Sequence, residues 1–150
     1  LWLIGLPAAS ICSQTVRSSG SLSFRCNGRL YSADSSHARA YAVKQTSAGF
    51  INAANKEDMI AGVEWKEIKG PGIFYINSKS GKADFTINHK TYSVKQTGDY
   101  VKIVINTVKQ QGPFLLLTGT FEGELQDKAG NKIRMTEGKF ETVSLQQKSK

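Results

Sequence analysis

Few side chains in this chain have the type and spacing that catalysis needs. The two histidines, His37 and His89, fall in separate segments, and neither has a cysteine or carboxylate at metal-ligand spacing. Glu122 and Glu124 stand two residues apart, where one could act as a general acid, but such a pair on the outside of a sheet is usually solvated. The sequence therefore predicts no catalytic site and no metal site.

Other signatures of enzymes and cation sites are also missing. Residues 127–131 resemble the start of a calcium loop but lack the further aspartate and the glutamate at the required spacing. The sequence has no glycine-rich phosphate loop, no Ser-His-Asp order and no CxxC pair. We therefore expect no cofactor.

Ligand binding is the other chemistry that these residue types allow. An aromatic ring can stack on a sugar or a base, and an arginine can hold a carboxylate. The candidates are Tyr41, Trp65 and Tyr100 for stacking and Arg39 for an acid, with Tyr75 and Arg134 as further possibilities. The core of a small β-domain also requires aromatic side chains, so each ring is a candidate for the core as well.

Two hairpins would position these side chains, because hydrophobic residues alternate with polar ones on either side of a tight turn. In the first, Asn27-Gly28 favours a type I′ turn, and Phe24, Tyr31 and Ala33 share the face to be buried. The second turns within residues 88–90. Its buried face is predicted to carry Phe85, Ile87, Tyr92 and Val94 whichever two residues form the turn.

The C-terminal third has the strongest strand pattern. Val101, Ile103 and Ile105 alternate with Lys102, Val104 and Asn106. Residues 114–125 form a long strand with glycines at 119 and 123, where a strand bends or passes a bulky neighbour. Residues 137–138 are predicted to turn before Phe140. Weaker strands are expected at 37–44 (with Tyr41 and Val43), 48–54 and 59–68, and one helical turn at 56–60.

About ten strands joined by short turns predict an all-β fold of 150 residues. The expected architecture is an antiparallel meander that forms a flattened barrel or a β-sandwich. Large inward side chains, including Phe24, Phe85, Phe121 and Phe140, should fill its interior and leave no void of ligand size.

The net charge of +8 is spread along the chain rather than concentrated. A basic surface attracts nucleic acid, anionic lipid or acidic glycans. No cluster of lysines is denser than two in four residues, which is typical of a solvated face, so nucleic acid is not the expected partner.

The first residues are apolar and are followed by small ones, as in a secretory signal peptide. We expect residues 1–14 to be the C-terminal part of such a peptide and residues 15–150 to be a single β domain; a buried first strand is the alternative. About a dozen apolar residues are too few for a transmembrane helix, which needs about 20. Cys12 could carry a lipid, although Ile11 fits a lipobox poorly. Cys26 would then be alone, and buried.

Two stretches resemble a known group of proteins. Residues 24–33, FRCNGRLYSA, are similar to the F-x-V-N-G-K-x-W-x-A opening of small exported proteins and lipoproteins of Bacteroidota that have no assigned function. Residues 119–140 are similar to their closing G-T-F-S-G-x-L-x-D-x-x-G-N-x-x-x-I-T-N-G-x-F. Cys26 and Glu137 depart from the pattern at positions that tolerate the change. The resemblance implies an exported β-domain, and it carries over no functional residue.

Taken together, these features predict an exported, non-enzymatic β-domain located in the periplasm, at the outer-membrane surface or outside the cell. Its expected role is that of a binding or structural module for an envelope glycan or a protein. One alternative is a lipocalin-like carrier of a small apolar ligand, and a second is a hydrolase with an unrecognised site.

Overall fold

The computed structural model describes residues 17–33, 36–95 and 98–146, and these ranges contain eleven strands and no helix. The predicted signal peptide, residues 1–14, lies outside the described residues. The described chain has no helix that is long and apolar enough to cross a membrane. The strands are β2 (Arg17–Cys26), β3 (Arg29–Ala33), β4 (Ala38–Val43), β5 (Ala48–Asn55), β6 (Met59–Trp65), β7 (Gly72–Ile76), β8 (Gly81–Ile87), β9 (Lys90–Ser93), β10 (Tyr100–Gln111), β11 (Phe114–Gln126) and β12 (Lys132–Gln146).

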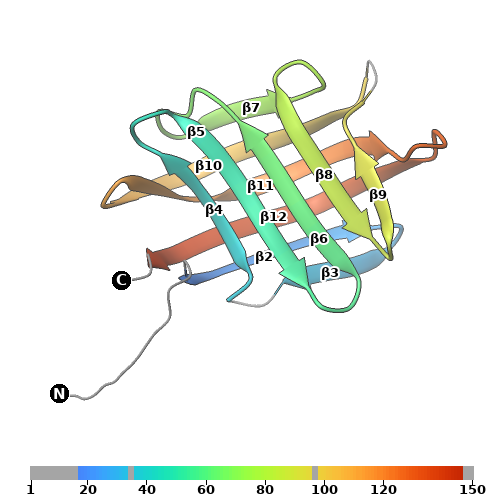
Figure 1. Cartoon of the computed structure of the whole chain (residues 1–150), viewed down its shortest axis with the longest axis horizontal. Helices are drawn as coiled ribbons and strands as arrows, with labels where there is room; N and C mark the ends of the chain where they lie inside the picture. The colour runs from blue at the N-terminus through green and yellow to red at the C-terminus, as the bar shows by residue number, and fades with distance from the viewer. Residues whose placement is uncertain (1–16, 34–35, 96–97, 147–150) are drawn as a thin grey trace.

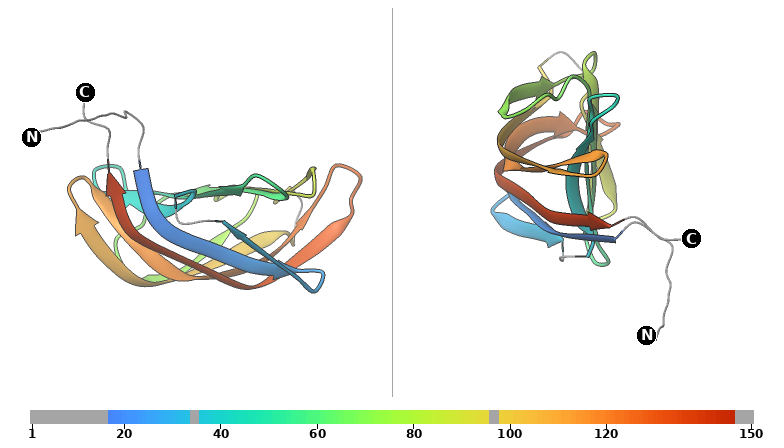
Figure 2. Two further views of the ribbon diagram at one scale, coloured as in Figure 1. Left: turned by 90° about the horizontal axis from the view of Figure 1, so that it is seen from below. Right: turned by 90° about the vertical axis from the view of Figure 1, so that its left-hand side faces the viewer.

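The strands form two layers that face each other (Figures 1 and 2). We call β4, β5, β6, β8 and β9 the front sheet, and β3, β2, β12, β11, β10 and β7 the back sheet. Strand β11 joins the layers, because Leu116 near its start pairs with Tyr41 of β4 and Gln126 at its end pairs with Ser93 of β9. The front sheet thus closes a partial ring with β11, which gives a flattened barrel or sandwich.

The predicted all-β antiparallel fold is confirmed, but several strand neighbours depart from chain order. Strand β12 lies between β2 and β11, β7 leaves the front sheet to pair with β10, and β4 pairs with β11. An alternating pattern defines which face of a strand is buried, whereas the partner along each edge depends on how the sheets fold over one another.

The core lies between the two sheets and is filled by aromatic rings. Phe85 packs against Phe24 with ring centroids 5.6 Å apart and against Phe121 at 6.1 Å, and Phe121 packs against Phe140 at 6.3 Å. The inward positions predicted from the alternation are confirmed. Phe24, Tyr31, Phe85, Ile87, Ile103, Leu117, Phe121 and Phe140 are buried, and Tyr92 is half-buried against them.

Both predicted hairpins are present, with type I′ conformations at their corners. Asn27 and Gly28 have φ of 53° and 78°, and Asn88 and His89 have φ of 51° and 70°, so residues 88–89 form the second turn. A Cβ at Gly28 would meet nothing within 4 Å. The backbone conformation alone therefore favours glycine there.

The predicted burial of Cys26 is confirmed. It is 2 % exposed, on the inner face of β2. This burial raises the pKa of the Cys26 thiol above its ordinary value, because the thiolate loses hydration inside the protein.

Two local predictions were wrong. Residues 137–138 do not end a strand; they form a β-bulge within β12, where Glu137 has φ of 52° and the register with β2 shifts. Residues 56–60 form no helical turn. Instead, the side-chain oxygen of Asn55 accepts hydrogen bonds from the backbone N–H groups of Glu57, Asp58 and Met59, and β6 begins directly.

The glycine at position 119 lies where the long strand β11 passes its neighbour closely. A Cβ on Gly119 would collide with the carbonyl group of Val104 on β10. The prediction that this glycine admits a close neighbour is therefore confirmed.

Candidate binding face

The outer face of the front sheet carries two of the predicted binding residues. Figure 1 looks onto this face, and none of the described strands lies over it. Strand β4 supplies two of the candidates, Arg39 and Tyr41, because Ala38, Ala40 and Ala42 occupy its buried positions. The weaker strand predicted at 37–44 thus turns its small side chains inward, and Tyr41 and Val43 outward.

Strand register arranges the outward side chains in two neighbouring rows. Residues directly opposite one another in a sheet share a face, with side chains within contact distance. The first row consists of Leu116, Tyr41, Phe50, Glu64 and Lys82, on β11, β4, β5, β6 and β8. The second row consists of Arg39, Asn52, Gly62 and Asp84, on β4, β5, β6 and β8.

We call four residues the outer aromatic cluster: Leu116, Tyr41 and Phe50 of the first row, together with Phe114, which pairs with Val43 of β4. Tyr41 stacks on Phe50 with centroids 5.3 Å apart and planes 27° apart, and meets Phe114 edge to face at 5.6 Å. The three rings are half-exposed, whereas Leu116 is 2 % exposed. Leu116 lies outside the core between the sheets, so this cluster is a second, external apolar group.

Arg39 differs from the other arginines whose side chains are described. Arg25, Arg29 and Arg134 approach carboxylates at 3.8, 2.5 and 3.9 Å, whereas Arg39 has no carboxylate partner among the described residues. Arg39 is half-buried and borders a hollow of about 340 Å³ with Asn52 as a neighbour. A partly desolvated guanidinium without an internal partner can hold an external anion.

A second hollow lies beside Glu64 and Lys82, the far end of the first row. It measures about 370 Å³ and is bordered by the exposed lysines Lys66, Lys79 and Lys82, together with Glu64. These lysines come from β8 and from the segments beside β6 and β8. The outer aromatic cluster therefore has Arg39 beside it in one direction and the three lysines in another.

The two carboxylates of this face are exposed rather than enclosed. Glu64 and Asp84 lie on adjacent strands and in adjacent rows, and the hydroxyl of Ser93 donates to Asp84. Gly62 lies between Asn52 and Asp84, and a Cβ there would meet nothing within 4 Å, so the face is shallowly hollowed at this point. An enclosed, apolar site of the kind that activates a general acid is not present around either carboxylate.

The other two binding candidates lie elsewhere. Trp65 is 3 % exposed and packs against Phe74 in the core at 6.2 Å, so its ring is not presented for stacking. Its indole nitrogen is buried without a hydrogen-bond partner among the described residues. Tyr100 lies on the back sheet beside Tyr75, at 6.4 Å. Of the four binding candidates, the structure therefore brings only Arg39 and Tyr41 together.

Sequence reasoning missed Phe50, Phe114 and Asn52 as members of this face. Phe50 and Asn52 lie opposite Tyr41 and Arg39 in the β4–β5 hairpin, and the signal that could have found them is the turn at 44–47, which sets that register. No comparable signal was available for Phe114, because β11 reaches β4 from 70 residues farther along the chain.

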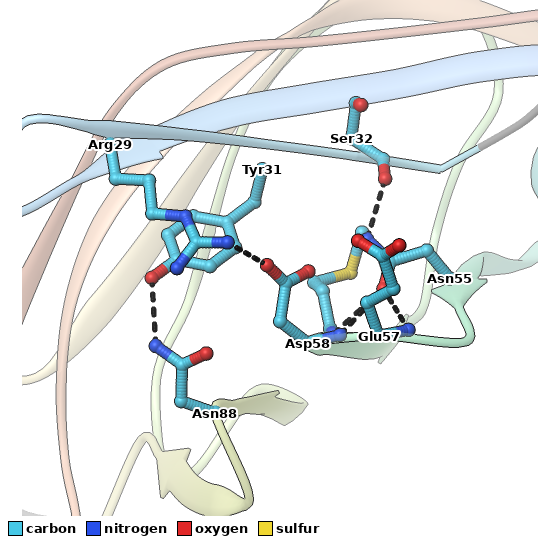
Figure 3. A network of polar contacts seen from close by, with 8 residues as sticks. Arg29, Tyr31, Ser32, Asn55, Glu57, Asp58 and Asn88 are labelled. Atoms are coloured by element: carbon cyan, nitrogen blue, oxygen red, sulfur yellow. Dashed lines mark hydrogen bonds and ion pairs between the residues drawn. The ribbon is translucent and has the colours of Figure 1, made fainter.

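A separate polar network joins one side of the back sheet to the turns of the front sheet (Figure 3). The Arg29 guanidinium binds Asp58 at 2.5 Å and lies over the Tyr31 ring, and Asn88 donates to the Tyr31 hydroxyl at 3.1 Å. The side-chain amide of Asn55 donates to the carbonyl of Ser32. Because these groups bind each other, the network holds the two layers together.

A buried carboxylate has a comparable role at the β9–β10 connection. Asp99 is 2 % exposed and accepts hydrogen bonds from the side-chain amide of Gln126 at 2.9 and 3.1 Å and from the backbone N–H of Lys95 at 3.0 Å. Gln126 is also the residue of β11 that pairs with β9. These bonds support the closure of the partial ring.

Within the described ranges, no three His, Cys, Asp or Glu side chains gather as a metal site. His37 precedes β4, and His89 lies in the β8–β9 turn. Glu122 and Glu124 lie half-exposed on the outer side of the back sheet, where Glu124 approaches Arg134. Comparison with protein-family models, curated proteins and solved structures gave no match to this chain.

Proposed function

We propose that this protein is an exported, non-enzymatic binding module that holds a glycan of the cell envelope on the outer face of its front sheet. The observation that carries the proposal is the outer aromatic cluster, half-exposed on an uncovered sheet face beside Arg39, to which the described residues offer no carboxylate. Export and an envelope location rest on the predicted signal peptide and on the resemblance to exported Bacteroidota proteins.

The chemistry of the face suits a sugar better than a flat apolar partner. A pyranose ring has an apolar face that packs on an aromatic ring and a rim of hydroxyl groups that need hydrogen-bond partners. Tyr41 and Phe50 supply the aromatic surface, and their neighbours in the second row, Arg39 and Asn52, supply donors and acceptors. This block of four side chains measures about 5 by 7 Å between Cα positions, the size of one sugar ring.

The aromatic rings also have a structural role that must be separated from binding. Cross-strand aromatic pairs contribute roughly 0.2 to 1 kcal/mol to a sheet, so Tyr41 and Phe50 stabilise the β4–β5 hairpin whether or not a ligand is present. A binding experiment therefore needs a control tyrosine in another strand pair, outside the proposed binding face. Tyr75, which is 57 % exposed and lies on the back sheet beside Tyr100, serves this purpose.

The test is a screen of the whole chain against purified envelope polysaccharides, followed by titration calorimetry with those that bind. Tyr41→Ala should weaken glycan binding at least tenfold, while Tyr75→Ala should leave it unchanged. Circular dichroism of each variant checks that the fold is retained. Equal loss in both variants, or binding by neither the native chain nor its variants, would remove the glycan proposal, and capture of a protein alone would favour a protein partner.

The lipocalin-like carrier and the hydrolase are less well supported. The rings that pack at 5.6 to 6.3 Å through the centre occupy the space in which a carrier would hold its ligand. Saturable micromolar binding of a lipophilic fluorescent probe, lost in Phe121→Ala, would favour the carrier instead. Release of reducing sugar from a bound glycan, lost in Glu64→Gln or Asp84→Asn, would favour the hydrolase.

A further inference from the structure

Resting on the proposed function, we infer that the bound glycan is acidic and carries carboxylates on more than one of its sugars. Arg39 is the first observation. It lies in the row next to Tyr41, half-buried, and the described residues give it no carboxylate. A carboxylate of the ligand can accept two parallel hydrogen bonds from the planar guanidinium of Arg39, in a bidentate geometry.

The positions of the other cations indicate more than one acid group. Lys82 lies three strands from Arg39, at the other side of Phe50, and Lys66 and Lys79 border the same hollow. Three strand spacings amount to about 14 Å, which is farther than one sugar ring spans. A single acidic sugar would reach one of these positions, whereas an oligosaccharide lying across β4, β5, β6 and β8 would reach both.

The carboxylates of the face distinguish an acidic glycan from a nucleic acid. Glu64 on β6 lies between the two cationic positions, and Asp84 lies on β8 in the row next to Lys82; both carboxylates are exposed. They would repel an acid group placed directly over them, but they accept hydrogen bonds from hydroxyl groups, which each sugar of an acidic glycan carries and a DNA backbone lacks. Four cations and two carboxylates thus suit a polymer that has both acid groups and free hydroxyls.

The experiment compares acidic polymers with neutral forms of the same backbone. The native chain is titrated with polygalacturonate and with alginate, each beside its esterified form, at 50 mM and at 500 mM NaCl. We expect at least one acid form to bind about tenfold or more tightly than its ester at low salt, and the preference to shrink at high salt because exposed charges are screened. A short oligomer of that polymer should bind more tightly than its monomer.

Variants assign the preference to the face. Arg39→Gln should reduce the preference for acid over ester about tenfold while binding of the ester is retained, and Lys66→Gln with Lys82→Gln should reduce it further. Arg134→Gln, which removes an arginine from the back sheet, is the matched control and should change neither affinity. Circular dichroism confirms that the variants fold.

The outcomes separate this inference from the function on which it rests. If no acid form is preferred over its ester, or if Arg39→Gln and Arg134→Gln behave alike, the acidic ligand is refuted, and binding of a neutral glycan that depends on Tyr41 would leave the proposed function intact. Absence of all glycan binding would refute both. Tighter binding of single-stranded DNA, with the same dependence on Arg39, would assign the face to nucleic acid and overturn the inference.

Discussion

Arg39 and Tyr41 project from the same side of β4, with Ala40 between them buried against the back sheet. The backbone N–H of Ala40 donates to the Thr142 hydroxyl of β12 at 2.6 Å, so the two layers approach closely under the binding face. Small side chains at this level of the core permit that approach, because a larger one would fill the space that β12 occupies.

Ala40→Leu should therefore destabilise the protein by about 1 to 3 kcal/mol, since the extra atoms force the layers apart. The neighbouring change Arg39→Gln should alter the free energy of unfolding by less than about 0.5 kcal/mol, because Arg39 lies on the outer face. Urea unfolding followed by the fluorescence of buried Trp65 measures both. A similar effect in the two variants would mean that the layers are not tightly packed at Ala40.

Gly28→Val should destabilise the protein by about 1 to 3 kcal/mol, because φ of 78° is unfavourable for a β-branched residue. The open space around Gly28 excludes a steric clash as the cause. Gly28→Asn is the matched control and should cost much less, since asparagine tolerates this conformation. Thermal unfolding of the three proteins gives the comparison, and equal melting temperatures would contradict the turn assignment.

The Cys26 thiol should react slowly with a thiol reagent at neutral pH in the folded protein and rapidly in urea. Its pKa is raised by burial, so the folded state retains the proton when the unfolded chain has lost it. The stabilising contribution is thus complete below the unfolded pKa of about 8.5 and is lost as the pH rises above that value. In Cys26→Ala, the free energy of unfolding should therefore decrease less as the pH rises into the alkaline range. Rapid modification of the folded chain would contradict the burial.

Asp127 should titrate below the ordinary pKa of an aspartate. The side-chain amide of Asn131 donates to it at 3.0 Å, and the backbone N–H groups of Asn131 and Ala129 donate at 2.9 Å, all of which favour the charged form and lower its pKa. The turn is stabilised above a pH of about 3.9, and this effect is lost as the pH falls through the folded pKa.

Carboxyl carbon chemical shifts measured against pH give this value directly. Asn131→Ala should raise the Asp127 pKa part of the way to its ordinary value, whereas Asn106→Ala, at an exposed bulge in β10, should leave it unchanged. An unshifted Asp127 in the native chain would show that the turn does not form in solution.

The sequence was sufficient to predict those parts of the fold that depend on local alternation. The hairpins at 27–28 and 88–89 and the buried side of β10 follow from period two and from turn residues, which act over a few positions. The sequence pattern of strand β4 was weaker, because its buried residues are alanines, whose hydrophobicity differs little from that of their neighbours. The pattern around Tyr41 and Val43 therefore suggested nothing about which way those side chains point.

The candidate site was only partly predictable, for a related reason. Arg39 and Tyr41 were identified as residue types, but their position beside Phe114 depends on the start of β11, which pairs with β4 while it remains paired with β10 of the back sheet. Trp65 was indistinguishable in sequence from an exposed aromatic, and its burial follows from packing against Phe74 of β7, a strand that pairs in the other layer. Contacts of this range are not encoded in local periodicity.

The partial ring has a consequence for self-association. An unpaired strand edge offers backbone groups to which a second chain can add a strand, and natural proteins protect such edges. In the front sheet, β4 is met by β11 on one side, and the four-residue strand β9 is met by β11 at Ser93 on the other. Side chains therefore provide the recognition on the outer face of this sheet. Among the described strands, β3 and β7 each pair on one side only, so each offers a full edge to which another chain could add a strand.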